Sequence, residues 1–414
     1  MLDTNFIREN PKAIKKAIKD RGLTINLDAF LRLDEKRRKL LADVEKLRAR
    51  RNTKSKGKPS AKDRLALKKL SGLVKKKELA LSGLQWEYKQ ALLSLPNIPH
   101  KSVPVGADES KNKQLKKYGK KLSIRNPKEH QEIDSVAPQI DQDRGARVSG
   151  SRFYFLRGPV AQLEHALMRY AVDFITAEGF ELLVIPILVG EDTLEGTGYF
   201  PNGRDEVYNV NPGKDDLFLI GTSEQAITAF HAGELLEHDS LPLKYAAQSP
   251  CFRREAGSYG KDTRGIIRVH QFDKVEMMIF CDPSKSWKML DGMVRLTEKF
   301  YRSLKLPYRL MNLCTGDLGF QAAKTIDIEG WFPGQGKYRE LGSASNATDF
   351  QARRLGIRTT DSNGKKQYVH TLNNTVVADR TLLAILENNQ KSDGSVEVPK
   401  VLQKYVGFKK ISTT

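Results

Sequence analysis

Two long stretches near the start of the chain place apolar side chains at alternating intervals of three and four residues. This is the heptad spacing of helices that pack side by side as a coiled coil. The segment 52–60 between them contains Gly57 and Pro59, which favour a turn. Because the connection is short, we expect the two helices to run antiparallel as a hairpin. The two series are Phe30, Leu33, Arg37, Leu40, Val44 and Leu47, and then Leu67, Leu70, Val74, Lys77, Leu81, Leu84, Tyr88, Ala91 and Leu95.

The pattern changes in segment 95–106, where three prolines remove backbone donors and end the second helix. A polar connector is expected over 101–147, between an N-terminal domain at 1–100 and a larger domain at 148–414. Short turns join several strands of the larger domain, so we predict an α+β fold with a mainly antiparallel sheet and helices packed on it. Helices are predicted at 162–177, 223–236, 285–303 and, last, 379–390, and strands at 180–189, 217–221, 243–254, 266–281, 309–313, 324–331 and 338–344.

Positive charge is concentrated in the predicted hairpin. The 414 residues carry a formal net charge of +20, and segment 36–77 holds 18 Lys or Arg against 3 Asp or Glu. Such a concentration is typical of a protein that binds a polyanion, because neutralising phosphates releases counterions. The alternative is a helix face that is merely solvated, or a disordered basic segment.

Several other classes of protein are disfavoured. Cys251, Cys281 and Cys314 form no CxxC pair, and the sequence contains no HExxH, GxxxxGK[ST] or GxGxxG motif after a strand. The start of the chain lacks the apolar core of a signal peptide. The longest apolar run, 182–189, is too short to span a bilayer. We therefore expect a soluble, cytosolic protein without a protein-ligated zinc ion or a membrane partner.

The predicted strand at 266–281 alternates two kinds of side chain. Ile267, Val269, Val275 and Met277 point to one face, which we assign to the core. The other face carries charged and aromatic groups, and Arg253 and Glu255 share a face of the preceding strand. One interpretation is a solvated surface with cross-strand ion pairs. The other is a floor on which arginines bind phosphates, an aromatic ring stacks on a base and carboxylates receive amino groups. The polar face is formed by Arg268, His270, Phe272, Lys274 and Glu276.

A carboxylate and a hydroxyl follow in "YRELGSASN", at Glu340 and Ser343. Mg²⁺ is commonly held by one or two such protein oxygens together with substrate phosphates. The segment therefore predicts a magnesium site beside the nucleotide.

The ordered motifs "GSRFYFLRG", "CFRREAGSYGKDTRGIIRVHQFDKVE", "YRELGSASNATDFQARR" and "VHTLNNT" resemble the class II aminoacyl-tRNA synthetases, and among them the seryl-tRNA synthetase family. The resemblance runs nearly end to end. It implies a catalytic domain built on an antiparallel sheet, which dimerises through "GFELLVIPIL" with Pro186. It also implies ATP, Mg²⁺ and L-serine as ligands. The N-terminal hairpin would grip the long variable arm of serine tRNA.

The resemblance also assigns roles to individual residues. Arg253, Arg268 and Arg380 would be catalytic and bind the phosphates, Glu255 would receive the adenine amino group, and Phe272 would stack on adenine. Glu340 and Ser343 would hold the metal. His270 is a neighbour rather than a base, since the serine carboxylate is already nucleophilic. The implied ATP set is completed by Arg254, Val269, Leu341 and Gly342, and the implied serine set is Thr222, Ser223, Glu224, Arg253, Glu276, Asn373 and Thr375.

The sequence departs from the family motif before its last arginine. In the motif the arginine lies six residues beyond the hydroxyl residue, whereas Arg380 lies five beyond Thr375, and Asp379 occupies a position that is normally small or neutral. One residue fewer turns a following helix by ~100°, which would aim Arg380 differently. Gly342 and Ala344 stand where Ser and Cys are frequent, a change that we expect the site to tolerate.

Three functions remain open on this basis. The first is a serine–tRNA ligase that forms seryl-adenylate and transfers the seryl group to tRNA. The second is a catalytically impaired paralogue that binds RNA, and the third is an amino-acid–carrier-protein ligase. The intact heptads count against the third, because carrier-protein ligases are expected to lack the hairpin. Charging of selenocysteine tRNA is compatible with the first function, but no residue indicates it.

Overall fold

The computed structural model describes residues 1–55, 60–121, 125–257 and 264–413. The chain divides into two compact units, Met1–Pro96 and Asn97–Thr414. The predicted turn at Gly57 and Pro59 lies outside the described residues.

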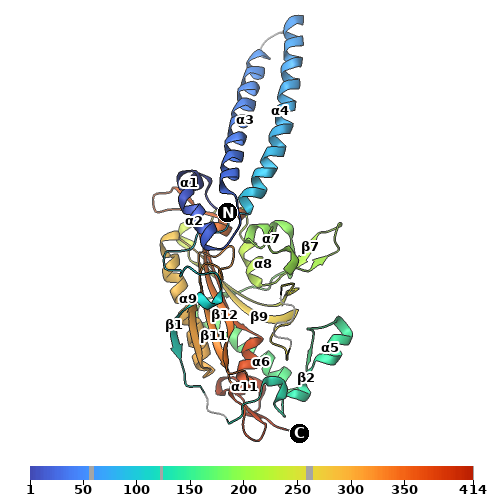
Figure 1. The fold of residues 1–414 in the computed structure, drawn as a ribbon, viewed down its shortest axis with the longest axis vertical. Coiled ribbons are helices and arrows are strands. Elements are labelled where there is room, and N and C mark those ends of the chain that lie inside the picture. Colours follow the sequence, from blue (N-terminus) through green and yellow to red (C-terminus); the bar gives the residue numbers. More distant parts are fainter. Residues whose placement is uncertain (56–59, 122–124, 258–263, 414) are drawn as a thin grey trace. The chain divides into compact units, whose positions relative to one another are not determined.

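The first unit contains the predicted hairpin. Helices α3 (Leu27–Lys54) and α4 (Ala61–Leu93) lie side by side (Figure 1). Every residue of the two heptad series within them is buried or half-buried. Phe30 stacks on Tyr88 with ring centroids 5.3 Å apart, and Lys77 pairs with Asp43 at 2.6 Å. Early residues of α3 thus meet late residues of α4, which confirms the antiparallel coiled coil. The helices of this unit are α1 Thr4–Glu9, α2 Pro11–Asp20, α3 Leu27–Lys54 and α4 Ala61–Leu93.

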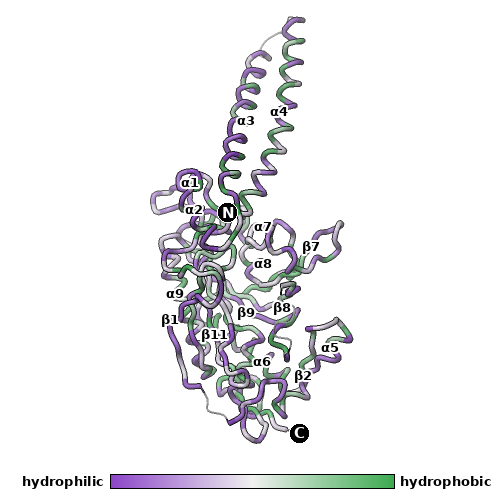
Figure 2. The backbone as a smooth tube through the Cα atoms, viewed as in Figure 1, coloured by the Kyte–Doolittle hydropathy of each residue, from purple (hydrophilic) through white to green (hydrophobic). Residues whose placement is uncertain are grey.

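Both long helices begin at residues whose side chains satisfy free backbone donors. The Asn26 side chain accepts from the Ala29 N–H, and Ser60 forms a reciprocal capping box with Asp63. Such caps are worth about 1 kcal/mol each. The hairpin itself is mostly hydrophilic, as Figure 2 shows along α3. Its stability therefore depends on the narrow heptad seam.

The second unit is built on a mainly antiparallel sheet, as predicted. Eight strands are joined in it within the described residues, and the parallel pairing is that of β4 (Glu181–Leu182) with β8 (Leu243–Phe252). In spatial order they are β1 Lys113–Tyr118, β10 Tyr308–Asn312, β11 Lys324–Phe332, β12 Lys337–Thr348, β15 His370–Ala378, β9 Gln271–Cys281, β8 Leu243–Phe252 and β4 Glu181–Leu182.

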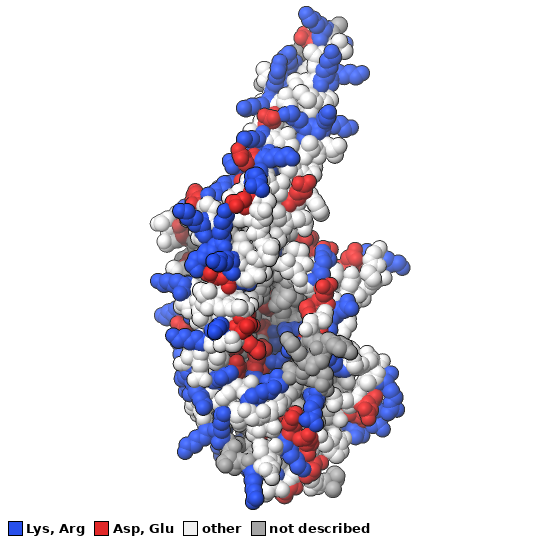
Figure 3. All heavy atoms as spheres, in the orientation of Figure 1, with Lys and Arg blue, Asp and Glu red and all other residues white. Residues whose placement is uncertain are grey.

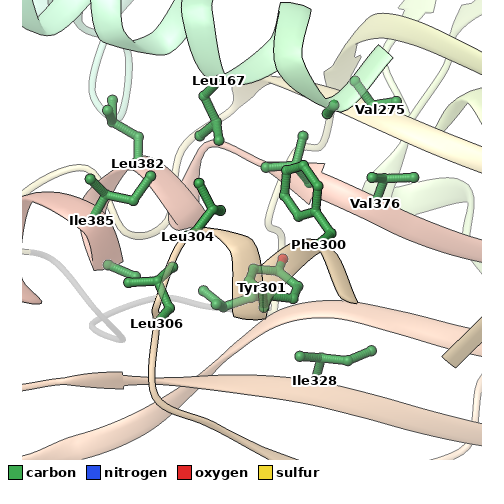
Figure 4. Packing of buried hydrophobic residues seen from close by; sticks show 14 of the residues in the cluster. Leu167, Val275, Phe300, Tyr301, Leu304, Leu306, Ile328, Val376, Leu382 and Ile385 are labelled. Carbon is green, nitrogen blue, oxygen red and sulfur yellow. The ribbon is translucent and has the colours of Figure 1, made fainter. Parts of the chain in front are cut away.

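Helices cover both faces of this sheet. One face packs α6 (Gly158–Ala177), α9 (Ser286–Ser303) and α11 (Arg380–Asn388) over the main apolar core, part of which is drawn in Figure 4. Met277 and Ile279 of β9 point into that core, whereas their neighbours Met278 and Phe280 join a second cluster with α8 (Ser223–Ala229) and α10 (Phe350–Leu355). The even-numbered face of β9 is therefore the face that carries the polar residues singled out above.

Smaller elements complete the unit. They are β2 Ile140–Asp141, α5 Gln142–Ser149, β3 Phe155–Leu156, β5 Leu188–Gly190, α7 Glu191–Thr197, β6 Asn209–Val210, β7 Leu217–Leu219, β13 Arg358–Thr360, β14 Lys366–Tyr368, β16 Val396–Glu397, α12 Lys400–Val406 and β17 Lys410–Ile411.

Some predicted boundaries are wrong, for identifiable reasons. The strands predicted at 243–254 and 266–281 are shorter, because the Arg254 and His270 N–H groups bond to carbonyls of Glu206 and Arg152 rather than to a ladder partner. The strand predicted at 180–189 is interrupted around Pro186. The helix predicted at 223–236 ends at Ala229, and Gly233 follows with a φ of +82°. The helix at 379–390 is α11, but the short α12 comes after it.

The segment 101–147 is more than a connector, since its strand β1 pairs with β10 at the edge of the sheet. We retain the division at 100 and 147 as a proposal. None of the described helices has the length and apolar composition needed to cross a bilayer. Cys251, Cys281 and Cys314 are buried and free, and burial raises the pKa of the Cys281 thiol to about 12.

Candidate active site

A hollow with about 600 Å³ of empty space opens beside the ends of β8, β9, β12 and β15. The arrangement follows from the antiparallel order β12-β15-β9-β8, which brings segments far apart in sequence to one place. The hollow is lined by Arg253, Glu255, Ile266, Ile267, Arg268, Val269, Phe272, Lys274, Glu340, Leu341, Gly342, Thr375, Ala378, Asp379 and Arg380.

Charged groups on one side of the hollow come from the segments that leave β8 and enter β9. Arg253 follows the last residue of β8, and its Nε donates to the Gly221 carbonyl at 3.1 Å. Its guanidinium carbon lies 5.2 Å from the centroid of the Phe272 ring. Arg268 pairs with Glu255, which has a φ of +52°. A half-buried ring and two cations therefore face one space.

Arg380 enters the hollow from the start of α11. It donates to the Glu340 carbonyl at 2.7 Å and to the Glu340 carboxylate at 3.2 Å. Burial alone would raise the pKa of Glu340, but the charges of Arg380 and Arg253 lower it. Between Thr375 and Val377 the pairing with β9 has a register irregularity, in which β15 has one residue more than β9. Despite the shorter spacing, Arg380 lies beside the other arginines.

Two further oxygens lie next to Glu340. The Ser343 hydroxyl donates to Asp327 at 2.5 Å and lies 3.4 Å from the Glu340 carboxylate. Burial, together with the charge of Glu340, raises the pKa of Asp327 well above its usual value. In the described ranges, no three His, Cys, Asp or Glu side chains gather to hold a metal ion by themselves. These oxygen donors suit a Mg²⁺ ion whose other ligands are phosphates and water.

A buried network lies deeper, around Glu276 of β9. Its carboxylate pairs with Lys274 at 2.7 Å and accepts from Asn373 and Thr375 at 3.0 Å each. Thr375 is the cross-strand neighbour of Glu276 on β15. Lys274 also donates to the Thr222 hydroxyl. The carboxylate is thus held in place by three donors from two strands.

A second buried carboxylate faces the same region from α8. Glu224 accepts from Tyr199 at 2.9 Å and from Gln351 at 2.7 Å. Burial raises its pKa, and the charge of Glu276 adds to the shift. Two carboxylates in one enclosed place form a site for a positively charged group.

Most of the residues named from the sequence are brought together. Nine of the eleven ATP residues line the hollow, whereas Arg254 and Ser343 lie outside its lining and the Arg254 side chain is exposed. Of the serine set, Arg253 and Thr375 line the hollow. Thr222, Glu224, Glu276 and Asn373 belong to the buried network beside it. The Ser223 hydroxyl is buried without a hydrogen-bond partner in the part of the chain that the structure describes.

Sequence reasoning missed the residues that hold these carboxylates. Lys274 was on the correct face of its strand but received no role. Tyr199, Gln351 and Asp327 gave no local signal, because their importance comes from partners far away in the sequence. Gly342 is explained by close packing, since a Cβ there would lie 3.0 Å from the Thr375 Cβ.

Comparisons with known families agree with this architecture. Residues 207–389 match the tRNA synthetase class II core domain (G, H, P, S and T), and residues 1–99 match the seryl-tRNA synthetase N-terminal domain. Serine–tRNA ligase of Rubrobacter xylanophilus is 41% identical over 417 residues, covering 98% of each chain. That of Pyrococcus horikoshii is 42% identical, covering 99% of this chain and 97% of the relative.

Solved structures extend the agreement to three dimensions. The crystal structure of seryl-tRNA synthetase from Pyrococcus horikoshii complexed with ATP has a TM-score of 0.92 at 40% identity, and each chain is fully covered. Cytoplasmic serine–tRNA ligase from Naegleria fowleri in complex with AMP has a TM-score of 0.88 at 34% identity, covering 100% of this chain and 99% of the other. The sheet and its hollow are those of a class II aminoacyl-tRNA synthetase. With the N-terminal match and the full-length relatives, the chain belongs to the seryl-tRNA synthetase family.

Proposed function

We propose that this protein is a serine–tRNA ligase, which activates L-serine with ATP and transfers the seryl group to the 3′ end of serine tRNA. The observation that carries the proposal is the buried carboxylate of Glu276, held by Lys274, Asn373 and Thr375, next to a hollow lined by three arginines. Full-length relatives of that name, one of them solved with ATP, support it.

ATP would occupy the hollow. Phe272 offers its ring to adenine, and Glu255 offers a carboxylate to the adenine amino group. Arg253 faces the α-phosphate, while Arg268 and Arg380 face the β- and γ-phosphates. Val269, Leu341 and Gly342 supply wall and backbone contacts. Guanidinium groups suit this task because they bind phosphate oxygens bidentately.

Glu340 and Ser343 would hold Mg²⁺ beside the phosphates. The ion would neutralise phosphate charge as it develops. The remaining electrostatic stabilisation would come from Arg253, whose position is fixed by its bond to the Gly221 carbonyl.

Serine would bind over Glu276 and Glu224, which provide carboxylates for its ammonium and hydroxyl groups. Its own carboxylate would be steadied by Arg253 and attack the α-phosphorus in line, so that pyrophosphate leaves and seryl-adenylate forms. The 3′-hydroxyl of tRNA would then attack the activated carbonyl. Alanine would be rejected strongly, since it leaves buried polar groups unpaired.

The hairpin would bind the long variable arm of serine tRNA through its exposed cations. Figure 3 shows Lys and Arg side chains along much of its length. Selenocysteine tRNA is not included in the proposal, because no described feature distinguishes it.

A homodimer is proposed from an exposed apolar groove at the predicted dimer motif. Leu183, Val184, Ile185 and Pro186 line this groove together with Phe230 of the neighbouring segment. Val184 is fully exposed at 100% and Phe230 is 56% exposed. Apolar surface of this kind is typical of a protein interface.

The two alternatives receive no support. Arg380 lines the hollow, so the shortened spacing gives no reason to infer an impaired enzyme. The intact hairpin counts against a carrier-protein ligase.

The proposal is tested by ATP–pyrophosphate exchange with serine, alanine and threonine in parallel. Exchange should depend on serine, and Arg253→Ala should abolish it. Arg169→Ala is the control, since Arg169 is exposed and pairs with Asp173 on α6. Absence of serine-dependent exchange in the unaltered protein would eliminate the proposed activity.

A further inference from the structure

Three carboxyl groups meet behind the hollow, where a second cavity lies against Phe272 and Asp379. Glu164 of α6, Asp273 of β9 and Asp379 line this second cavity, together with Tyr154 and His165. Glu164 and Asp379 are only 8% and 7% exposed. Such enclosed carboxylates need donors or protons, because burial of unpaired negative charge is costly.

Asp379 is tied to three separate elements. Its carboxylate accepts from the Tyr154 hydroxyl at 2.5 Å and from the Asp273 N–H at 2.9 Å. The third neighbour is the Glu164 carboxyl, which lines the same second cavity as Asp379. The residue that departs from the family motif is therefore firmly anchored.

Glu164 has a simpler environment. Within the described residues, no N–H or O–H group donates to either of its oxygens, and neither forms an ion pair. Two carboxyl groups that are buried in one cavity repel each other when both are charged, whereas one proton between them can make a strong hydrogen bond. Burial and the neighbouring charge of Asp379 raise the pKa of Glu164 well above its usual value, and burial raises the pKa of Asp379 to about 6. These directions favour Glu164 as the donor and Asp379 as the acceptor of a shared proton.

The pair stands directly before Arg380. Asp379 precedes the first residue of α11, and Asp379 and Arg380 both line the ATP hollow. Anchoring Asp379 fixes the backbone from which the Arg380 side chain reaches Glu340. We propose that Glu164, as a carboxylic acid, donates to Asp379 and, together with Tyr154, positions Arg380 for the triphosphate of ATP.

This inference rests on the proposed use of the hollow for ATP. It makes Glu164, Tyr154 and Asp379 positioning residues, since none of them needs to touch the phosphates. It also predicts a specific weakness: loss of the shared proton leaves two adjacent buried charges, which displace the start of α11. The other ionisable groups facing the pair are Asp273, Tyr154 and His165.

Direct ATP binding tests the inference without requiring serine activation. Calorimetric titration of a non-hydrolysable ATP analogue, with Mg²⁺, is carried out from neutral to alkaline pH. The unaltered protein should lose affinity as pH rises through the raised pKa of Glu164. Glu164→Gln keeps a donor that cannot ionise. Its affinity for the analogue should therefore equal that of the unaltered protein at neutral pH and stay constant as the pH rises.

Variants that remove a donor should behave differently. Glu164→Ala and Tyr154→Phe should each weaken binding of the analogue by about tenfold or more at neutral pH. In pyrophosphate exchange they should raise KM for ATP more than KM for serine. Glu298→Gln is the matched control, because Glu298 is another buried helix glutamate but pairs with Lys116 and Arg302 instead. It should leave the affinity and its pH dependence unchanged.

The outcomes separate this inference from the proposed function. Superimposable pH profiles for the unaltered protein and Glu164→Gln would overturn it, as would donor-removing variants that lower only the folded fraction in thermal unfolding. Absence of analogue binding in the unaltered protein would overturn both. Normal pH-dependent binding without serine-dependent exchange would overturn the proposed function alone.

Discussion

The hairpin and the hollow hold their charged side chains in opposite ways. In the hairpin, Lys68, Lys69, Lys75 and Lys76 are exposed, and cross-helix ion pairs such as Arg48–Glu78 lie in solvent. Around the hollow, Lys274 and Glu276 are only 5% and 0% exposed and share several partners. The interaction energies of exposed charges are small, because salt screens them, and they add up. The energy of a buried charge depends on each particular partner.

This contrast explains how the two units can serve one reaction. A polyanion is attracted by the sum of many cations, so no single lysine is essential. A small amino acid and a nucleotide need a few groups at fixed positions. The effects of single substitutions on activity should therefore be large and specific in the second unit. In the first unit they should be small and should add up.

The largest effect is expected for Glu276→Ala. It leaves Lys274 buried without its carboxylate, which should cost about 3–5 kcal/mol of unfolding free energy. Serine-dependent exchange should fall by ~10³-fold, because an enclosed charged group that binds the substrate is removed. Urea unfolding and exchange assays measure the two effects.

The double variant Lys274→Met with Glu276→Leu is the control for stability. Replacing a buried ion pair with apolar side chains is often neutral, so stability should return while activity does not. Recovery of exchange in the double variant would contradict the assignment of Glu276 to serine.

The second-largest effect is expected when most of the hairpin is removed. Deleting residues 36–80 should leave the rate of serine-dependent exchange within a few-fold of that of the unaltered protein. It should lower charging of serine tRNA by at least ~10²-fold, since the cations that neutralise tRNA phosphates are removed. Both reactions can be followed on one preparation. Loss of exchange with charging no worse affected would refute the division of labour between the units.

The pH dependence of serine binding tests the role of one buried group of the second unit, the carboxylate of Glu224. Burial raises the pKa of Glu224, so its carboxylate becomes protonated at a higher pH than an exposed glutamate. KM for serine should therefore rise as pH falls through that raised pKa. Glu224→Gln should have a higher but flatter KM in pyrophosphate exchange. Parallel profiles for both proteins would exclude Glu224 as the ammonium partner.

The smallest effects are expected for single hairpin cations. Lys68→Gln should weaken tRNA binding only two- to threefold, by roughly the value of one exposed ion pair. Replacing Lys68, Lys69, Lys75 and Lys76 together should make the salt dependence of binding shallower, by roughly 0.7–0.9 in the log–log slope for each phosphate that is no longer neutralised. The double variant of exposed Lys365 and Lys366 is the control. An unchanged slope in the fourfold variant would remove these lysines from the interface.

Periodicity and motifs by themselves determined much of this protein. The heptads fix the hairpin because side-chain spacing alone decides which helix face is apolar. Alternation along 266–281 correctly separated Val275 and Met277 from Phe272 and Glu276, since a strand reverses its side chains at every residue. The order of motifs led to the family.

Only the tertiary structure decided which polar groups meet. The pairing of Tyr199 and Gln351 with Glu224, and of Asp379 with Tyr154, joins residues between 25 and 225 positions apart. The direction of Arg380 also could not be read from its spacing, because it depends on where the start of α11 packs and on the bonds of Arg380 to Glu340. Local patterns report which face a side chain occupies, whereas partners, burial and proton sharing arise from the packing of distant elements.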